Sequence, residues 1–455
     1  MLLTTLFFQP NFAIIKIISM KYNMKYIAVL ILILYLPVNA QEIISIDKSE
    51  VIIKIKNRNL SLKISAEEFN KAQADYRQTN AIFLPNITAS HTGFTTTNPL
   101  MAFGSKLNQG ILTQADFNPA LLNNPTQTQN FATIIKVEQP LINMDGVYQR
   151  KAAKSKMKAM SLQTQRTEEY LVFEVEKAYM ELQLAYKAVT VLEKALQAAN
   201  ENQKLAENSF KQGYLQRADV LNVEVRVTEV QNQLQQAKSN VQNASNYLSF
   251  LMNEEAYVQY IPSDELNIQT VSMIDTKISE NRSDIKAMQL ASNAYGDMNK
   301  AEKMTFLPRL NAFGSYELYD NKIFQADANG YLVGAQLSWD LFNGSKRFGK
   351  VQKSKAEFEK SKLEYDQYLS KSNLELNKAK RMLMDAENKL NLSKLALTQS
   401  EESLRIRTNR FKEGLEKTTD LLAAETQFSQ KQLEYYQTIF EYNYAQAYLK
   451  FLTKE

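Results

Sequence analysis

Two stretches of the sequence repeat the same side chains at the same spacing. In SFKQGYLQRADVLNVE (209–224) and RFKEGLEKTTDLLAAE (410–425), a glycine is followed six residues later by an aspartate and then by a glutamate. Glycine adopts left-handed backbone conformations at little cost, so it favours a chain reversal at each site. Each aspartate then falls in the first turn of the next helix, where a carboxylate complements the helix dipole; Thr419 is a candidate cap.

No other set of side chains supports catalysis or metal binding. The 455 residues include no cysteine and one histidine, which excludes disulfides, thiolate ligands, cysteine nucleophiles and multi-histidine metal sites. The sequence has no phosphate-binding glycine loop and no dense carboxylate motif, and its single histidine supports no Ser-His-Asp triad. The net charge of +5, from 54 basic and 49 acidic residues, does not indicate a nucleic-acid-binding surface. We therefore expect no enzyme activity, no metal and no cofactor.

The N-terminus has the features of a secretory signal. A basic segment precedes the apolar run IAVLILILYL (27–36), and the small residues VNA follow, ending at Ala40. This pattern predicts a cleavable signal peptide over residues 1–40, with translation starting at Met20 or Met24. An inner-membrane anchor is the alternative, although the apolar run is short for a bilayer span.

Long helices are expected wherever glycine and proline are missing. Neither residue occurs in 147–212, 215–261, 350–413 or 415–455, and these segments are rich in good helix formers. Apolar residues recur at three- and four-residue steps, as in Leu171, Val175, Ala178, Leu182, Ala185, Val189 and Leu192. This spacing predicts amphipathic, coiled-coil-like helices far longer than a globular domain uses.

Short segments between these helices alternate apolar and polar residues, as strands do. The clearest are 309–319 and 330–341, and 84–94 and 131–141 are less regular candidates. About ten tilted residues suit a membrane strand, although alternation alone also fits a soluble sandwich. The predicted membrane-facing residues of the last strand are Val333, Ala335, Leu337, Trp339 and Leu341.

The sequence repeats itself once. Gly213 and Asp219 recur at Gly414 and Asp420, an offset of 414 − 213 = 201, and the segment Tyr247-Leu248-Ser249-Phe250-Leu251 recurs in part at the same offset. Phe83-Leu84-Pro85 recurs as Phe306-Leu307-Pro308, an offset of 306 − 83 = 223, so the first copy has an enlarged loop near 94–130. The prediction is two structural repeats, 41–260 and 261–455, each with a helix, a β-hairpin and a long helix pair. The hairpins are expected at about 84–142 and 307–342, and the long helix pairs at about 147–252 and 347–453. Four strands cannot close a barrel alone, so several chains must pool them.

From about residue 57 onward, the chain resembles the TolC family of outer-membrane efflux proteins. The resemblance rests on the motif FxxGxxxxxDxLxxE, present twice, and on the hairpins opened by FLP. It implies a mainly α fold with a membrane β-barrel portion. In a homotrimer, four strands per chain would close a 12-stranded barrel, and the long helices would form an α-helical coiled-coil barrel across the periplasm. A belt of mixed structure is expected from residues 253–282 and the mature N-terminus.

The resemblance also implies partners and functional residues. A periplasmic adaptor would dock at the hairpin tips, Gly213, Tyr214, Leu215, Gly414 and Leu415, and an inner-membrane RND or ABC pump would deliver the substrates. The gate candidates are Asp219, Asp420, Phe411 and Glu416, because well-known members carry an acidic ring near the constriction. Phe411 replaces a gating tyrosine, Glu416 replaces an arginine, and Ala423 stands where a second acidic residue is usual, so the gate chemistry must differ.

The implied function is an outer-membrane channel that exports small toxic compounds. A type I protein-secretion channel and a soluble periplasmic coiled-coil scaffold are the alternatives. His91 is expected to be a barrel or rim residue. Two basic clusters open the long helices and either meet anionic lipid headgroups or form a solvated face; they are Arg150, Lys151, Lys154, Lys156 and Lys158, and Lys346, Arg347, Lys350, Lys353 and Lys355.

Overall fold

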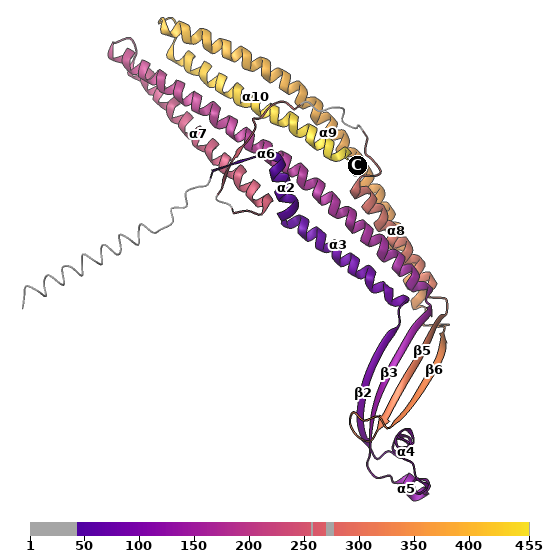
Figure 1. The fold of residues 1–455 in the computed structure, drawn as a ribbon. Coiled ribbons are helices and arrows are strands. Elements are labelled where there is room, and N and C mark those ends of the chain that lie inside the picture. Colours follow the sequence, from indigo (N-terminus) through magenta and orange to yellow (C-terminus); the bar gives the residue numbers. More distant parts are fainter. Residues whose placement is uncertain (1–42, 256–257, 270–276, 455) are drawn as a thin grey trace, which may run out of the picture.

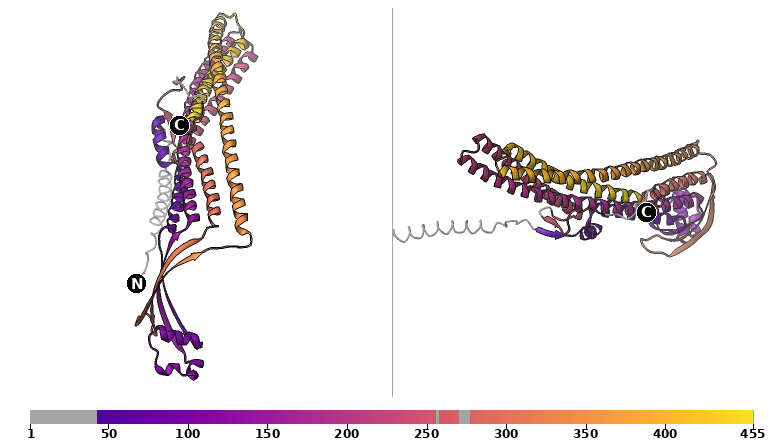
Figure 2. Two further views of the ribbon diagram at one scale, coloured as in Figure 1. Left: turned by 90° about the vertical axis from the view of Figure 1, so that its right-hand side faces the viewer. Right: turned by 90° about the horizontal axis from the view of Figure 1, so that it is seen from above.

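The chain is an elongated rod with a four-stranded sheet at one end and two helical hairpin tips at the other (Figure 1). The computed structural model describes residues 43–255, 258–269 and 277–454. The predicted signal peptide lies outside the described residues, as do residues 256–257 and 270–276 of the predicted belt. Figure 2 shows the same rod from two further sides. No helix in the described part of the chain is long and apolar enough to cross a membrane.

Four long helices make up most of the rod. They are α6 (Met144–Lys211), α7 (Arg217–Met252), α9 (Lys346–Lys412) and α10 (Thr418–Thr453). At 68 residues, α6 extends about 100 Å. It begins where the Asn143 side chain accepts a hydrogen bond from the Gly146 amide at 3.1 Å. The predicted apolar stripe of α6 lies in the core, where Val175 and Leu182 pack against Leu248 of α7.

Short helices continue the line of the long hairpins. Helix α3 (Leu60–Gln78) begins where α7 ends, and α8 (Ser283–Met304) begins where α10 ends. The Asn59 side chain donates to the carbonyl of Leu251 at 2.8 Å, and Arg282 donates to the carbonyl of Leu452 at 2.9 Å. These pairs are related by the offsets of the sequence repeat, because 282 − 59 = 223 and 452 − 251 = 201. Both junctions therefore satisfy a carbonyl that a helix end leaves unpaired.

The sheet contains the four strands β2 (Asn86–Thr96), β3 (Thr128–Ile142), β5 (Arg309–Asp320) and β6 (Ala328–Ser338). They are antiparallel in the order β2-β3-β5-β6, so β2 and β6 are the two edges. The prediction that the last strand runs to residue 341 is wrong, because β6 ends at Ser338. The Trp339 indole donates to the carbonyl of Phe306 at 2.9 Å, and Arg347 donates to the carbonyl of Asp340. These two bonds fix residues 339 and 340 beside the end of α8 and the start of α9, outside the sheet.

The enlarged loop between β2 and β3 is partly helical, which its loop-like composition did not predict. It contains α4 (Pro99–Asn108), the 3₁₀ turn η2 (Gln114–Phe117) and α5 (Pro119–Asn123). Asn98 and Asn118 cap the two α-helices, each followed directly by proline at the first helical position. Both choices favour a helix start, so the local signals for these helices were present in the sequence.

A small layer of mixed structure covers one side of α6 near its middle. Strand β1 (Ile43–Ile46) pairs in parallel with β4 (Gln259–Pro262), and α2 (Lys48–Arg58) follows β1. Tyr179 and Tyr186 of α6 donate to the carbonyls of Ile46 and Tyr260, at 3.2 and 3.0 Å. The 3₁₀ turn η1 (Thr79–Ile82) links α3 to the sheet.

Candidate functional site

The sheet has one mainly apolar face and one mainly polar face. Directly paired residues of neighbouring strands point to the same side, so the register assigns each side chain to a face. The long helices leave both faces open (Figure 1). Val333 and Leu337 are 75% and 67% exposed in the single chain. The apolar face carries Ile87, Ala89, Ile135, Val137, Leu310, Ala312, Tyr316, Tyr331, Val333, Ala335 and Leu337, together with the polar His91, Thr133 and Gln139. The polar face carries Asn86, Thr88, Ser90, Lys136, Glu138, Asn311, Ser315, Glu317 and Gln336, together with the apolar Ile134, Phe313 and Leu332.

The remaining predicted members of the apolar face lie beyond the sheet. Trp339 and Leu341 are exposed, but both follow the end of β6.

His91 lies in β2, where its Nδ1 is 2.8 Å from the Thr133 hydroxyl and its ring stacks on Phe324 at 4.5 Å. The contacts described for His91 are with a hydroxyl and an aromatic ring, so they are those of a structural residue of the sheet.

Both hairpin tips turn at the repeated glycine. Gly213 has φ +82° and Gly414 has φ +74°, values that other residues adopt only at a cost. The amide of Tyr214 donates to the carbonyl of Ser209, and that of Leu415 to the carbonyl of Arg410, both at 2.9 Å. This pattern closes each helix end with a tight reversal.

The residues after the two glycines differ in exposure. Tyr214 is 79% exposed and Leu415 is 63% exposed, so both present large apolar surfaces to the outside of the tips. Leu215 is partly buried and packs against Ala206 and Val220. Of the tip residues predicted to dock a partner, Tyr214 and Leu415 therefore offer the accessible side chains.

The two aspartates of the motif have different surroundings. The carboxylate of Asp219 accepts a hydrogen bond from the Gln216 amide at 3.1 Å, so Asp219 serves the start of α7. Within the described residues, Asp420 makes no such bond to Lys417, the residue at the N-cap of α10. The prediction of Thr419 as the cap is wrong, because α10 already begins at Thr418. The Asp420 carboxylate is therefore free of the capping role that occupies Asp219.

Glu416 joins an ion-pair cluster within the second tip. Its carboxylate accepts from Arg407 at 2.6 Å and from Arg410 at 2.9 Å. The carbonyl of Phe411 accepts from the Gly414 amide at 3.0 Å, and the Phe411 ring is partly buried. Glu416 thus connects the turn to the last two turns of α9, whereas Phe411 contributes packing and a backbone bond.

Two arginines of the basic clusters have a structural role. Arg150 donates to the hydroxyls of Thr79 and Tyr76 at 3.1 and 3.0 Å, and Arg347 donates to the carbonyl of Thr305 at 3.0 Å. Each arginine therefore ties the start of a long helix to the end of a short one. The lysines of both clusters are exposed, so for them both predicted roles stay open; they are the lysines at 151, 154, 156, 158, 346, 350, 353 and 355.

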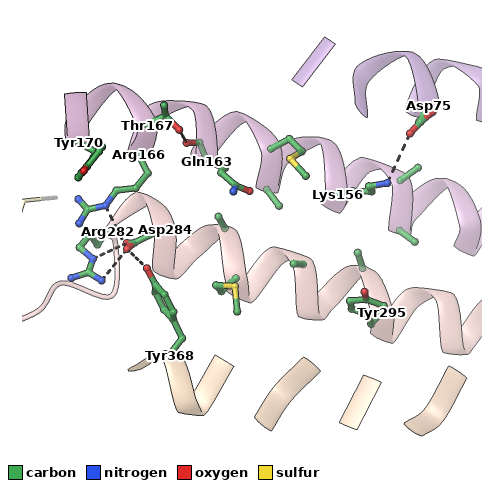
Figure 3. Close-up of a pocket in the computed structure, with 18 of the residues that line it drawn as sticks. Asp75, Lys156, Gln163, Arg166, Thr167, Tyr170, Arg282, Asp284, Tyr295 and Tyr368 are labelled. Carbon is green, nitrogen blue, oxygen red and sulfur yellow. Dashed lines mark hydrogen bonds and ion pairs between the residues drawn. The ribbon is translucent and has the colours of Figure 1, made fainter. Parts of the chain in front are cut away.

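A groove of about 1040 Å³ is lined mainly by α6 and α8, with a few residues from α9 and α10 (Figure 3). At one end Asp284 accepts from Arg282 at 2.7 Å and from the Tyr368 hydroxyl at 2.6 Å, and Arg166 lies 3.5 Å away. Burial alone would raise the pKa of Asp284, but these hydrogen bonds and positive charges outweigh it and lower the pKa. Burial and the bond to Asp284 raise the pKa of Tyr368 to about 12.

This charged cluster stabilises the junction of α8 with α10 and was not predicted. Arg282 is almost fully buried and bonds both Asp284 and the end of α10, so its charge is already compensated. Among the described residues, no group of three or more histidines, aspartates or glutamates could hold a metal ion.

Comparison with known proteins identifies a family whose sequence pattern this chain shares. The family model described as outer membrane efflux protein matches residues 51–254 and 276–453. A comparison with curated proteins finds no match.

Similar solved structures include three bacterial outer-membrane proteins, two of which are described as channels. VceC of Vibrio cholerae is 17% identical with a TM-score of 0.75, covering 88% of this chain and 94% of VceC. CmeC of Campylobacter jejuni is 15% identical with a TM-score of 0.77, covering 89% of this chain and 85% of CmeC. The open state of MtrE from Neisseria gonorrhoeae is 16% identical with a TM-score of 0.73, covering 89% of this chain and 88% of MtrE. These likenesses establish a shared fold, and the family match over most of the chain shows that it belongs to the outer membrane efflux protein family.

Proposed function

We propose that this chain works as a homotrimeric outer-membrane channel, the exit duct of a tripartite efflux system. The observation that carries the proposal is a sheet with one lipid-compatible face, one polar face and two free edges. An open strand edge is not tolerated in lipid, so β6 of one copy must pair with β2 of the next. Three copies supply twelve strands, enough to close a barrel with the polar face around a water-filled lumen.

The helices support the same closure. Across the part of the rod near the tips, neighbouring helices follow the order α9, α10, α6, α7, which leaves α9 and α7 as the outer flanks. Helix α9 carries a stripe of exposed apolar residues opposite its buried face, and at 100° per residue it is about 80° wide. The stripe consists of Leu363, Leu374, Met384, Leu392, Leu395 and Ile406. An exposed apolar stripe of this kind is stabilised when another surface covers it. Closure of the ring brings the next copy against the stripe, with its α7 near the tips and its α3 nearer the sheet.

The hairpin tips would then form the periplasmic gate and docking end. The tips lie at the opposite end of the rod from the sheet, so they reach furthest from the outer membrane (Figure 1). Asp420, whose carboxylate does not cap its helix, is the strongest candidate for an acidic ring at the constriction. The exposed side chains of Tyr214 and Leu415 suit an adaptor that docks on the tips, with an RND or ABC pump behind it.

Export by living cells tests this proposal. A deletion strain is expected to accumulate several-fold more of at least one dye from a panel of toxic cationic and neutral dyes, and the wild-type gene should restore export. A Tyr214→Ser, Leu415→Ser double variant should assemble in the outer membrane and yet fail to restore export, because the docking surface is lost. Lys371→Ala, in an exposed mid-helix position, is the matched control and should restore it. Unchanged accumulation of every dye in the deletion strain contradicts a role in efflux.

A further inference from the structure

The two helical hairpins meet near their tips through two apolar layers. In the layer closer to the tips, Leu422 of α10 packs against Ala206 of α6 and Val223 of α7. In the layer further from the tips, Leu433 of α10 packs against Leu192 and Leu234. Apolar contacts of this kind hold α10 against the α6–α7 hairpin.

An ionisable group lies between these layers. The carboxylate of Glu425, on α10, is partly buried and accepts a hydrogen bond from the Asn202 amide of α6. Arg226 of α7 is buried nearby, and its charge acts on Glu425. The carboxylate thus bonds α6 directly and lies within the field of a positive charge on α7. We call Glu425, its bond to Asn202 and the neighbouring charge of Arg226 the latch.

The sequence repeat supplies a matched comparison. The counterpart of Glu425 is Glu224, since 425 − 201 = 224, and Glu224 pairs with Arg217 of its own helix at 3.2 Å. The counterparts of Asn202 and Arg226 at the same offset are Ser403 and Gln427. A glutamate therefore stands in both repeats, but the two residues that face Glu425 in the latch have no equivalents in the second repeat to face Glu224.

Burial makes the protonation of Glu425 sensitive to mild pH changes. It raises the pKa of Glu425 from an ordinary 4.5 to about 6, although the Asn202 bond and the Arg226 charge both lower it. A raised pKa means that the joined hairpins bind a proton more tightly than separated hairpins do. Proton binding to Glu425 therefore stabilises the joined hairpins. This stabilisation is fully present below about pH 4.5 and is lost as the pH rises through about 6.

The charged groups around the latch do not remove this effect. Arg226 faces Glu425 from α7, but it also lies 3.6 Å from Glu229 and shares its charge with that residue. Helix α6 presents a neutral amide, Asn202. On α9, Arg407 and Arg410 bond Glu416 in the described structure. The ionised carboxylate therefore has one shared counter-charge in a largely apolar contact, which is an unfavourable environment.

We propose that Glu425 is a positioning residue of the gate: protonated, it holds the α9–α10 hairpin against α6–α7, and ionised, it lets the hairpins separate and the tip open. The inference rests on the proposed channel function and adds to it a pH-dependent gate that is located away from the tip turns. Asn202 and Glu425 come from different hairpins, so their contact must break when the hairpins separate.

Channel recordings of the purified full-length protein in planar lipid bilayers test the latch. The probe is K⁺ current at fixed voltage between pH 4 and pH 8, without an adaptor. A pKa difference of about 1.5 units permits each latch to raise the wild-type ratio of open to closed channels by up to about thirtyfold over this range, and three latches that open together permit a larger rise. Glu425→Gln, permanently neutral, should stay at the low ratio at every pH. Glu224→Gln, its counterpart in the first repeat, should follow the wild type.

A second variant covers the case in which Glu425→Gln fails to assemble. Asn202→Ala removes the bond that favours the ionised carboxylate, so the midpoint of opening should move to higher pH. A wild-type ratio that does not change with pH, or a Glu425→Gln channel with the wild-type pH profile, overturns the latch. Loss of the pH response in Glu224→Gln overturns it too. Failure to conduct at any pH contradicts the channel function itself, which separates the two failures.

Discussion

A cysteine in place of Asp420 is expected to link neighbouring subunits and to abolish export of toxic compounds. If the helices taper to closure at the tip, residues around Asp420 approach their symmetry mates in the resting channel. A disulfide requires Cα atoms within about 7 Å, so its formation reports closure directly. The chain has no native cysteine, so a single introduced cysteine in this protein can pair only with the same residue of another copy. We expect at least one position between Thr418 and Ala423 to crosslink.

The measurement is non-reducing electrophoresis together with drug susceptibility of the same cells. Reductant should restore export as it removes the crosslink. Lys371→Cys is the control: it is exposed in the middle of α9, where the tunnel should be wide, and it should not crosslink. A disulfide joins two of the three subunits, so one disulfide in every trimer together with normal export would place the constriction elsewhere.

An arginine on the apolar face of the sheet should impair assembly, whereas an arginine on the polar face should not. Leu337 lies on the apolar face opposite Leu310, and its neighbour Gln336 lies on the polar face opposite Asn311. Arginine on the lipid side costs about 2–4 kcal/mol at the middle of a bilayer and about 0–1 kcal/mol near its interfaces. Leu337 lies one residue from the end of β6, so we expect a cost toward the lower end of this range. Leu337→Arg should therefore lower the amount of assembled protein in the outer membrane, while Gln336→Arg should leave it near the wild-type level.

The two residues are adjacent in one strand, so the pair controls for local strand propensity. Heat-modifiable migration in electrophoresis measures assembly for both variants. Equal tolerance of arginine at Leu337 and Gln336 would show that the faces are assigned wrongly.

The long helices and the core of each strand could be predicted because their signals are local. Stretches without glycine or proline became α6, α7, α9 and α10, and alternation placed β5 and β6 close to their observed positions. The strand end was mispredicted at Trp339, because its indole bonds a carbonyl from a distant part of the chain. Alternation continues past Ser338 in the sequence, so nothing local marks the point where the sheet stops.

The charged groups buried between helices could not be predicted, because their burial depends on packing between distant segments. Asn202 and Glu425 are 223 residues apart in sequence, and Arg282 bonds a carbonyl 170 residues away. Comparison of repeat positions held a partial signal. Arg282 stands where the first copy has the neutral Asn59, an exchange that points to a local requirement for charge. The positive charge of Arg282 is balanced by Asp284. Asp284 also accepts a hydrogen bond from Tyr368 of α9, a contact that forms only in the folded chain.

The number of chains in the purified protein tests the pooled sheet most directly. Light scattering or native mass spectrometry in mild detergent should give three copies, because three four-stranded sheets supply the twelve strands of the proposed barrel and so pair every free edge. The same ring covers the exposed apolar stripe of each α9. A Leu392→Asp, Leu395→Asp double variant should lower the trimer fraction, since it places charges in the stripe. A stable wild-type monomer with a folded sheet would contradict the account.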